Sequence, residues 1–102
     1  MDLIHLQTFV TVAEEKSISG AARRLFTTPS AISMQIKALE TELCVQLFVR
    51  TSRGVELTDV GRHLKVKAQH TLQSAQEFSD YATETQHKAV GRVALGLNAA
   101  PS

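Results

Sequence analysis

Cysteine and aromatic residues are scarce in this chain. Its 102 residues include one cysteine, Cys44, together with four Phe, one Tyr and no Trp. A single cysteine excludes a disulfide within the chain and any zinc site built from several cysteines. The apolar runs are only a few residues long, whereas a helix that crosses a bilayer needs about 20 apolar residues, so we expect no membrane span.

The sequence also lacks signals for export and for catalysis. The segment Met1–His5 has no basic region followed by an apolar stretch, so we expect no signal peptide and a reducing, cytoplasmic location. The histidines are scattered, and His63 and His70 lie two helical turns apart, too far to share a metal ion without other ligands. No glycine-rich phosphate loop is present. We therefore expect no enzymatic activity, no metal and no cofactor in this chain.

The charge is unevenly distributed along the chain. Hydrophobic residues make up 43% and charged residues 21%, which suits one small folded domain with a net charge of +1. Residues 23–67 carry eight basic and four acidic side chains, whereas the segments on either side are net acidic. A basic middle favours a polyanionic partner, although a run of charge is more often only a solvated surface.

Three short helices are predicted in the first half of the chain. Apolar residues at helical spacing predict an amphipathic helix over residues 3–15. Ser17 and Ser19 are candidate N-caps for a second helix. Thr28–Pro29 combines a capping hydroxyl with proline at the first helical position, which predicts a third helix over residues 29–43. The predicted buried face of the third helix comprises Ile32, Ile36, Leu39 and Leu43.

Alternating polar and apolar residues after the third helix predict a two-stranded hairpin. Its strands are expected over Gln46–Arg50 and Val55–Leu57, with the turn Thr51–Gly54 between them. Arg50 and Arg53 flank this turn, so the hairpin has a basic tip.

A long fourth helix is predicted after the hairpin. Thr58–Asp59 is its expected N-terminal cap, and no residue breaks it before Gly91, so it spans about 30 residues and about 45 Å. A second copy of the chain is the simplest cover for its apolar stripe, the alternative being a frayed helix. This predicted dimerisation stripe comprises Leu64, Ala68, Leu72, Ala75, Phe78 and Ala82. We expect its members from Leu72 onward to lie beyond the reach of the preceding residues.

Residues 91–102 change character again. Val93, Leu95 and Leu97 alternate with small or polar residues in the manner of a strand, but no second strand follows. We expect this segment to be the start of another, truncated domain.

Three short helices followed by a hairpin describe a winged helix-turn-helix. The predicted fold is therefore mainly α, with a two-stranded wing and a long dimerisation helix after it. In this fold the third helix enters the major groove of DNA, and the wing touches the backbone or the minor groove. The third helix suits this role because its exposed face is small, polar and free of carboxylates. That face holds Ser30, Met34, Lys37 and Thr41, with Ser33 on its flank.

The residue types on this face match known base and phosphate contacts. Serine hydroxyls donate or accept hydrogen bonds, Lys37 can reach a guanine or a phosphate, and Met34 can pack on a thymine methyl. Arginines of the wing suit phosphate or the minor groove, the alternative being solubilising charge at a loop tip. Arg23 and Arg24 are weaker phosphate candidates. The predicted DNA contacts are Thr28, Ser30, Ser33, Met34, Lys37, Arg50, Arg53 and Arg23.

With these residues in view, the sequence resembles the LysR-type transcriptional regulators. The resemblance covers residues 1–62 closely and is specific as a set. It is carried by Leu6–Phe9, Ser17–Leu25, Pro29–Glu40, Leu47–Thr51 and Leu57–Gly61.

The resemblance implies a domain order and a mode of action. It implies a DNA-binding head over 1–58, with the helix-turn-helix at about 18–37, a linker helix over 59–90, and the start of an effector-binding domain over 91–102. Such regulators bind pseudo-palindromic promoter sites as homodimers or tetramers with antiparallel linker helices. They respond to a small-molecule coinducer, and RNA polymerase is a further candidate partner.

The chain departs from the family pattern at three places. Met34 stands where many members have a basic residue, and Pro29–Ser30 stands where many have Gln-Pro, so those base contacts cannot be copied. Cys44 stands where glycine is usual after the third helix, which implies strain or a different cap. An inert thiol is favoured there over a redox switch.

Two other functions stay open at this point. The first is the winged-helix head of another bacterial regulator family, such as a molybdate-responsive repressor, which would share the head but not the sequence past Gly91. The second is a dimerisation or protein-interaction module without DNA binding. Binding to promoter fragments distinguishes the last of these from the first two.

Overall fold

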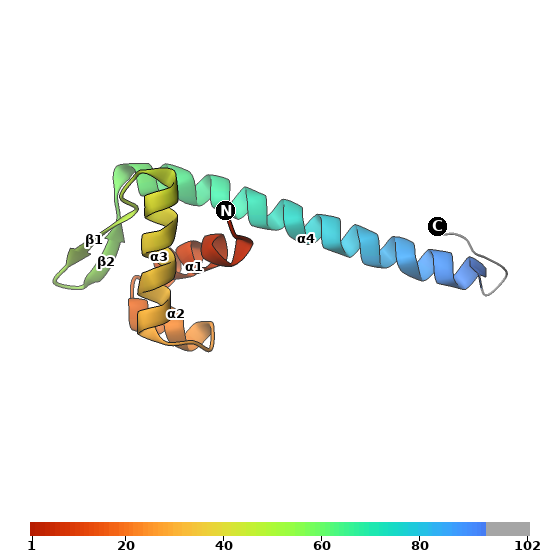
Figure 1. Ribbon diagram of the computed structural model, residues 1–102, viewed down its shortest axis with the longest axis horizontal. Coiled ribbons are helices and arrows are strands. Elements are labelled where there is room, and N and C mark those ends of the chain that lie inside the picture. Colours follow the sequence, from red (N-terminus) through yellow and green to blue (C-terminus); the bar gives the residue numbers. More distant parts are fainter. Residues whose placement is uncertain (94–102) are drawn as a thin grey trace. The chain divides into compact units, whose positions relative to one another are not determined.

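The computed structural model describes the backbone of residues 1–93 and the side chains of residues 1–86. The chain divides into two compact units, Met1–Leu72 and Gln73–Ser102. The element order is α1 Leu3–Glu15, α2 Ile18–Arg24, α3 Pro29–Leu43, β1 Phe48–Thr51, β2 Gly54–Leu57 and α4 Asp59–Val93 (Figure 1). The mainly helical fold with a two-stranded wing, predicted from the sequence, is confirmed.

Side-chain oxygens begin each of the first three helices. Asp2 accepts from the backbone N–H of Ile4 at 3.0 Å and starts α1. Ser17, rather than Ser19, caps α2 by accepting from the N–H of Gly20 at 2.9 Å. Thr28 caps α3 in the same way and is followed by proline at the first position. These caps explain why the predicted bounds of α1 and α3 match the observed ones.

Three residues after helices adopt the left-handed conformation. The φ angles of Lys16, Phe26 and Cys44 are 56°, 57° and 59°. Glycine is the usual residue at such positions, because a Cβ atom is disfavoured there. Cys44 therefore carries the backbone strain that its place in the sequence predicted.

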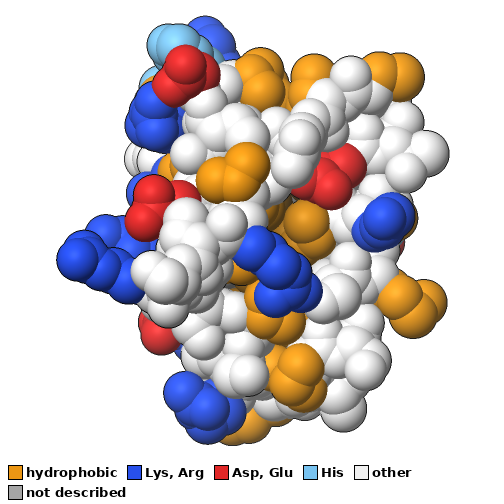
Figure 2. Space-filling model, turned by 90° about the vertical axis from the view of Figure 1, so that its left-hand side faces the viewer, with side chains coloured by type: hydrophobic (Ala, Val, Ile, Leu, Met, Phe, Trp, Pro, Cys, Tyr) orange, Lys and Arg blue, Asp and Glu red, His pale blue; other side chains and the backbone are white. Residues whose placement is uncertain are grey.

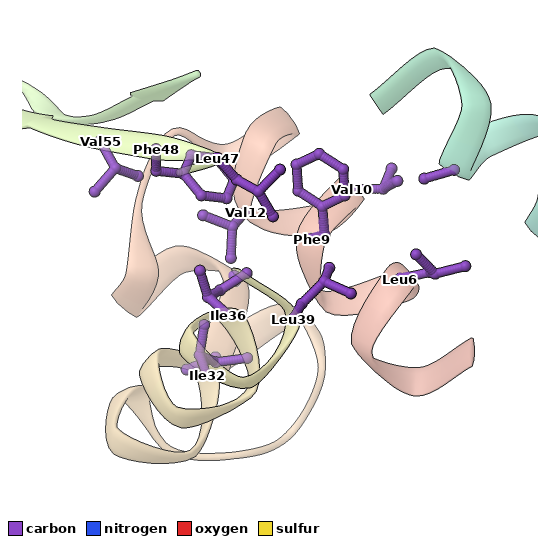
Figure 3. Close-up of a cluster of buried hydrophobic side chains, with 13 residues drawn as sticks. Leu6, Phe9, Val10, Val12, Ile32, Ile36, Leu39, Leu47, Phe48 and Val55 are labelled. Carbon is purple, nitrogen blue, oxygen red and sulfur yellow. The ribbon is translucent and has the colours of Figure 1, made fainter. Parts of the chain in front are cut away.

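The core of the first unit lies between α1, α3 and the hairpin (Figure 3). The rings of Phe9 and Phe48 meet edge to face with their centroids 5.7 Å apart. Thr8 is 1% exposed, and its hydroxyl donates to Oε1 of Gln35 at 2.5 Å, which ties α1 to α3. Ile36 and Leu39, among others on that face of α3, are buried, so the opposite face of the helix is left to solvent.

The wing is a short antiparallel hairpin whose turn end is bonded to the end of α1. Phe48 pairs with Leu57, and Thr51 pairs with Gly54 at the turn. The strands therefore begin and end at slightly different residues than the alternation predicted. At the turn, Gly54 has a φ of 128°, and a Cβ there would lie 2.5 Å from the carbonyl oxygen of Lys16. The N–H of Val55 donates to that same oxygen at 3.3 Å, which holds the wing against the end of α1.

The beginning of α4 belongs to the first unit. Ala68 is 4% exposed, and Leu64 and Leu72 pack against the core cluster. The expectation that Leu72 lies beyond the reach of the head is therefore wrong. The part of α4 that packs on the head extends at least to Leu72.

The end of α4 differs from the predicted one as well. The helix continues through Gly91 to Val93, since a single glycine costs a helix only about 1 kcal/mol. The alternation that predicted a strand in residues 91–102 therefore starts on a helical residue, Val93. Its other members, Leu95 and Leu97, lie outside the described residues.

Candidate nucleic-acid interface

The exposed face of α3 holds the residues that the sequence singled out. Ser30, Ser33 and Lys37 are exposed, and Met34 is 72% exposed. Within residues 1–86 none of these four side chains forms a salt bridge. The face is therefore accessible, has one positive charge and carries both hydrogen-bonding and apolar groups, which is the combination that reading base edges requires.

Thr28 combines a structural role with a place at the start of this face. Its hydroxyl oxygen accepts from the N–H of Ala31 at 3.1 Å, so the residue is first of all the cap of α3. A hydroxyl also has a hydrogen to donate, and Thr28 is exposed. The cap can therefore donate to a phosphate oxygen while it holds the helix end.

A groove of about 320 Å³ runs between α3 and the wing. Ser33 and Lys37 line it from α3, and Arg50 lines it from β1. The groove thus brings Ser33 and Arg50 together, although they are 17 positions apart in the sequence. Figure 2 shows Lys and Arg side chains projecting from this side of the molecule, with hydrophobic side chains and some Asp and Glu side chains between them.

Arg53 lies at the tip of the wing. Its backbone N–H donates to the hydroxyl of Thr51 at 3.1 Å, which fixes the turn, and its side chain is exposed. Because the guanidinium is held by no salt bridge among residues 1–86, it is available to a phosphate or to the minor groove.

The structure distinguishes the two arginines of α2. Arg24 donates to Glu14 at 2.8 Å and to Glu15 at 3.2 Å. The hydrogen bond with Glu14, followed by that with Glu15, raises the pKa of Arg24 above its ordinary value. Arg23 is exposed and lies within salt-bridge distance of no carboxylate among residues 1–86. Arg23 is therefore the phosphate candidate of this pair.

Sequence reasoning missed two residues beside the interface. Phe26, in the turn before α3, is 96% exposed. Its signal in the sequence is a large apolar residue in an otherwise polar turn. Glu40, on the inner side of α3, accepts hydrogen bonds from the wing, with 2.7 Å to the backbone nitrogen of Leu47. No sequence signal indicates the hydrogen bond between Glu40 and Leu47, because it depends on how the chain folds back after α3.

The later part of the predicted dimerisation stripe lies in the second unit. Ala75 is half-buried, Phe78 is 76% exposed, and Ala82 is exposed. Tyr81, which the stripe omitted, is 70% exposed. An exposed phenylalanine and tyrosine three residues apart on one helix form an apolar surface that the described part of this chain does not cover.

Two other kinds of site are absent from the described residues. No helix in that part of the chain combines the length and the apolar character that crossing a membrane requires. No group of three or more His, Cys, Asp or Glu side chains there is arranged to hold a metal ion.

Comparison with known proteins places this arrangement in a family. Residues 3–62 match the model of the bacterial regulatory helix-turn-helix proteins of the lysR family. The chain belongs to the LysR family. It is 44% identical over 78 residues to the transcriptional regulator IlvY of Escherichia coli, a match that covers 76% of this chain and 26% of IlvY. The chain thus spans about a quarter of the length of this curated LysR relative.

Two solved structures of LysR proteins bound to DNA have the same fold. The DNA-binding domain of CbnR, in a complex with DNA, is 34% identical with a TM-score of 0.80, and the match covers 84% of this chain and 99% of that domain. The DNA-binding domain of BenM, in a complex with benA site 1 DNA, is 35% identical with a TM-score of 0.80, covering 84% and 97%.

Proposed function

We propose that this chain is the DNA-binding and linker part of a bacterial LysR-type transcription regulator. Residues 1–58 form the winged helix-turn-helix head, with the helix-turn-helix at about 18–37, and α4 is the linker and dimerisation helix. The residues after α4 begin an effector-binding domain. The observation that carries the proposal is the accessible face of α3 with Ser30, Ser33, Met34 and Lys37, which lies beside the basic wing. The likeness to two DNA-bound LysR domains supports it.

Each predicted contact has a distinct part in this proposal. Ser30, Ser33, Met34 and Lys37 read base edges in the major groove, because they occupy the exposed face of α3. Arg50 bridges from the groove beside α3 to the backbone. Thr28, Arg23 and Arg53 hold phosphates at the edges of the interface and set the position of α3 without reading sequence.

Self-association goes with DNA binding in this proposal. Ala75, Phe78 and Ala82 pair α4 with the same helix of a second chain, and Tyr81 extends that surface. Leu64, Ala68 and Leu72 contribute less, because the head already covers them. Two linked heads bind two half-sites of a pseudo-palindrome, so that two weak contacts act as one through their effective concentration.

The remaining roles belong to the whole regulator. A protein of this kind acts on promoter DNA in the cytoplasm, works by binding rather than catalysis, and responds to a small-molecule coinducer through its effector-binding domain. Tetramer formation and contact with RNA polymerase belong to that whole regulator as well.

Selection of binding sites from a random DNA pool tests the proposal. We expect an enriched pseudo-palindromic sequence and binding that weakens steeply with salt, because phosphate contacts release counterions. Lys37→Ala and Ser33→Ala should each weaken binding to that sequence by about 1–3 kcal/mol while the head stays folded. Lys67→Ala, an exposed lysine of α4, is the matched control and should leave affinity unchanged. Failure to enrich any sequence contradicts the proposal.

A further inference from the structure

Phe26 occupies a turn position that a side chain does not favour. It comes after Leu25, the C-cap of α2, and has a φ of 57°. Its N–H donates to the carbonyl of Arg23 at 3.3 Å, and the N–H of Thr27 donates to the carbonyl of Ala22 at 2.9 Å. This pair of hydrogen bonds is the Schellman arrangement, in which the left-handed residue is usually glycine. Phenylalanine is among the residues that adopt this conformation least readily.

Packing within the chain does not account for the phenylalanine. Its side chain is 96% exposed, the highest exposure of any large hydrophobic residue in the described part of the chain. A strained residue that contacts almost nothing in its own molecule contributes little to folding, and such outliers point to a role outside the fold. The ring is therefore available for an intermolecular contact.

The surroundings of Phe26 favour a polyanionic partner. Between Glu15 and Glu40 the sequence has no Asp or Glu at all, while residues 16–39 contain four basic residues. That stretch covers α2, the turn and most of α3. Glu14 and Glu15 of α1 contact Arg24, whereas Arg23, three residues before Phe26, is exposed and lies within salt-bridge distance of no carboxylate among residues 1–86. This positive charge close to Phe26 in the chain favours DNA as the partner.

The position of Phe26 also fixes which part of the DNA it can reach. It lies two residues before Thr28, the cap of α3. In helix-turn-helix proteins the first residues of this helix contact base edges in the major groove, so the turn before them lies at the rim of the same groove. The apolar feature that DNA presents there is the C5-methyl group of thymine, and phenylalanine is one of the residues that contact it.

We propose that Phe26 packs on a thymine C5-methyl group at the edge of each half-site and is a specificity-determining residue of this DNA-binding head. The proposal rests on the proposed function and adds a contact that the polar face of α3 does not supply. It differs from the role of Met34, which lies further along α3 and meets a different base pair.

Replacing thymine with uracil tests this contact, because uracil lacks only the methyl group. Each thymine of the enriched site is replaced in turn, and the affinity of the chain is measured by fluorescence anisotropy. We expect one thymine at the edge of each half-site at which the replacement weakens binding about fourfold, as the loss of one buried methyl group predicts. Phe26→Gly should bind the unmodified site with about the same fourfold loss and should be insensitive to uracil at that position.

Two further variants separate side-chain loss from other effects. Phe26→Leu keeps an apolar group and should retain part of the sensitivity to uracil. Met34→Ala is tested with the same set of uracil replacements. It should lose as much affinity as the unsubstituted chain when the thymine assigned to Phe26 is replaced. Phe26→Gly relieves the left-handed strain, so it should melt no lower than the unsubstituted chain and its weaker binding cannot come from unfolding.

The outcomes distinguish this proposal from the one on which it rests. If no sequence is enriched, DNA recognition itself fails. A second outcome is that a sequence is enriched, but Phe26→Gly lowers the affinity by the same factor whether each position holds thymine or uracil. In that case Phe26 contacts the DNA backbone and the proposal is overturned. It is also overturned if Phe26→Gly binds DNA normally and instead loses transcription with purified RNA polymerase, since the ring then contacts a protein.

Discussion

The carboxylate of Glu40 on α3 accepts hydrogen bonds from two backbone N–H groups at the base of the wing. Its Oε2 lies 2.7 Å from the nitrogen of Leu47 and 3.4 Å from that of Phe48. Lys37 lies one turn before Glu40, and Arg50 lies two residues after Phe48. One side chain therefore fixes the distance between the helix proposed to read bases and the wing proposed to hold the backbone.

Removing this carboxylate should loosen the wing. We expect Glu40→Ala to lower the free energy of unfolding by about 1–3 kcal/mol, because the N–H of Leu47 loses its partner in a buried position. Glu40→Gln keeps an acceptor oxygen and should cost less. Urea denaturation followed by circular dichroism gives both values. Glu42→Ala is the control, since the exposed pair of Glu42 with the N-terminus of Met1 contributes only about 0–1 kcal/mol. Equal losses at both positions would contradict this role of Glu40.

Replacing Cys44 with glycine should stabilise the head. The left-handed conformation destabilises a residue that has a Cβ by about 1–2 kcal/mol. Glycine avoids this cost, but its greater freedom in the unfolded chain offsets about half of the gain. The net gain in the free energy of unfolding should be about 0.5–1 kcal/mol. Cys44→Ala keeps the Cβ and is the matched control, expected to give no gain. The prediction fails if the alanine variant is as stable as the glycine variant under reducing conditions.

Gly61, in the first turn of α4, should not tolerate a side chain. A Cβ there would overlap the carbonyl oxygen of Leu47, a backbone atom that cannot move aside. We expect Gly61→Ala to cost about 1–3 kcal/mol, despite the better helix propensity of alanine. Gly20→Ala is the comparison, because its Cβ would meet the movable end of Glu15 at 3.2 Å. Thermal melts should show a large drop for the first variant and little change for the second.

Arg53→Ala should weaken binding to all DNA sequences about equally. A phosphate contact carries no sequence information, and its loss should reduce the slope of log affinity against log salt by about one. Anisotropy titrations at several salt concentrations on the enriched site and on random DNA give both quantities. Arg24→Ala is the control, because Glu14 and Glu15 already neutralise that guanidinium. A loss confined to one base pair would instead mean that the wing reads sequence directly.

The dimer should depend on the second unit. We expect the double variant Ala75→Asp, Phe78→Asp to be a monomer at micromolar concentration, with a folded head and much weaker binding to the enriched site. The pair Gln73→Asp, Gln76→Asp adds the same charge away from the stripe and should stay dimeric. Sedimentation velocity separates the two states. A persistent dimer in the first variant would place the interface elsewhere.

The local elements were predictable because their signals are local. Ser17, Thr28 and Pro29 determine where α2 and α3 begin, and the spacing of Ile32, Ile36 and Leu39 determines which face of α3 is buried. The exposed face of α3 follows from the same spacing, so four of the proposed base contacts could be found from the sequence.

Features that depend on packing between distant residues could not be predicted. Leu72 was expected to need a second chain, yet it packs on the core of its own head. The choice between Arg23 and Arg24 depends on where α1 places Glu14 and Glu15. The exposure of Phe26 follows from how the turn closes, and hydrophobicity alone suggests that a phenylalanine is buried.

Thr58 connects the wing mechanically to α4. Its hydroxyl donates to the carbonyl of Gln46 at 2.6 Å and accepts from the N–H of Gly61 at 3.0 Å, while the N–H of Thr58 donates to Leu47 at 2.9 Å. The base of the wing and the first turn of α4 are thereby joined as one lever. Because Leu64, Ala68 and Leu72 hold α4 against the core, a rotation of α4 about its axis would act on the core and the wing together, and the phosphate contact proposed for Arg53 would change with them.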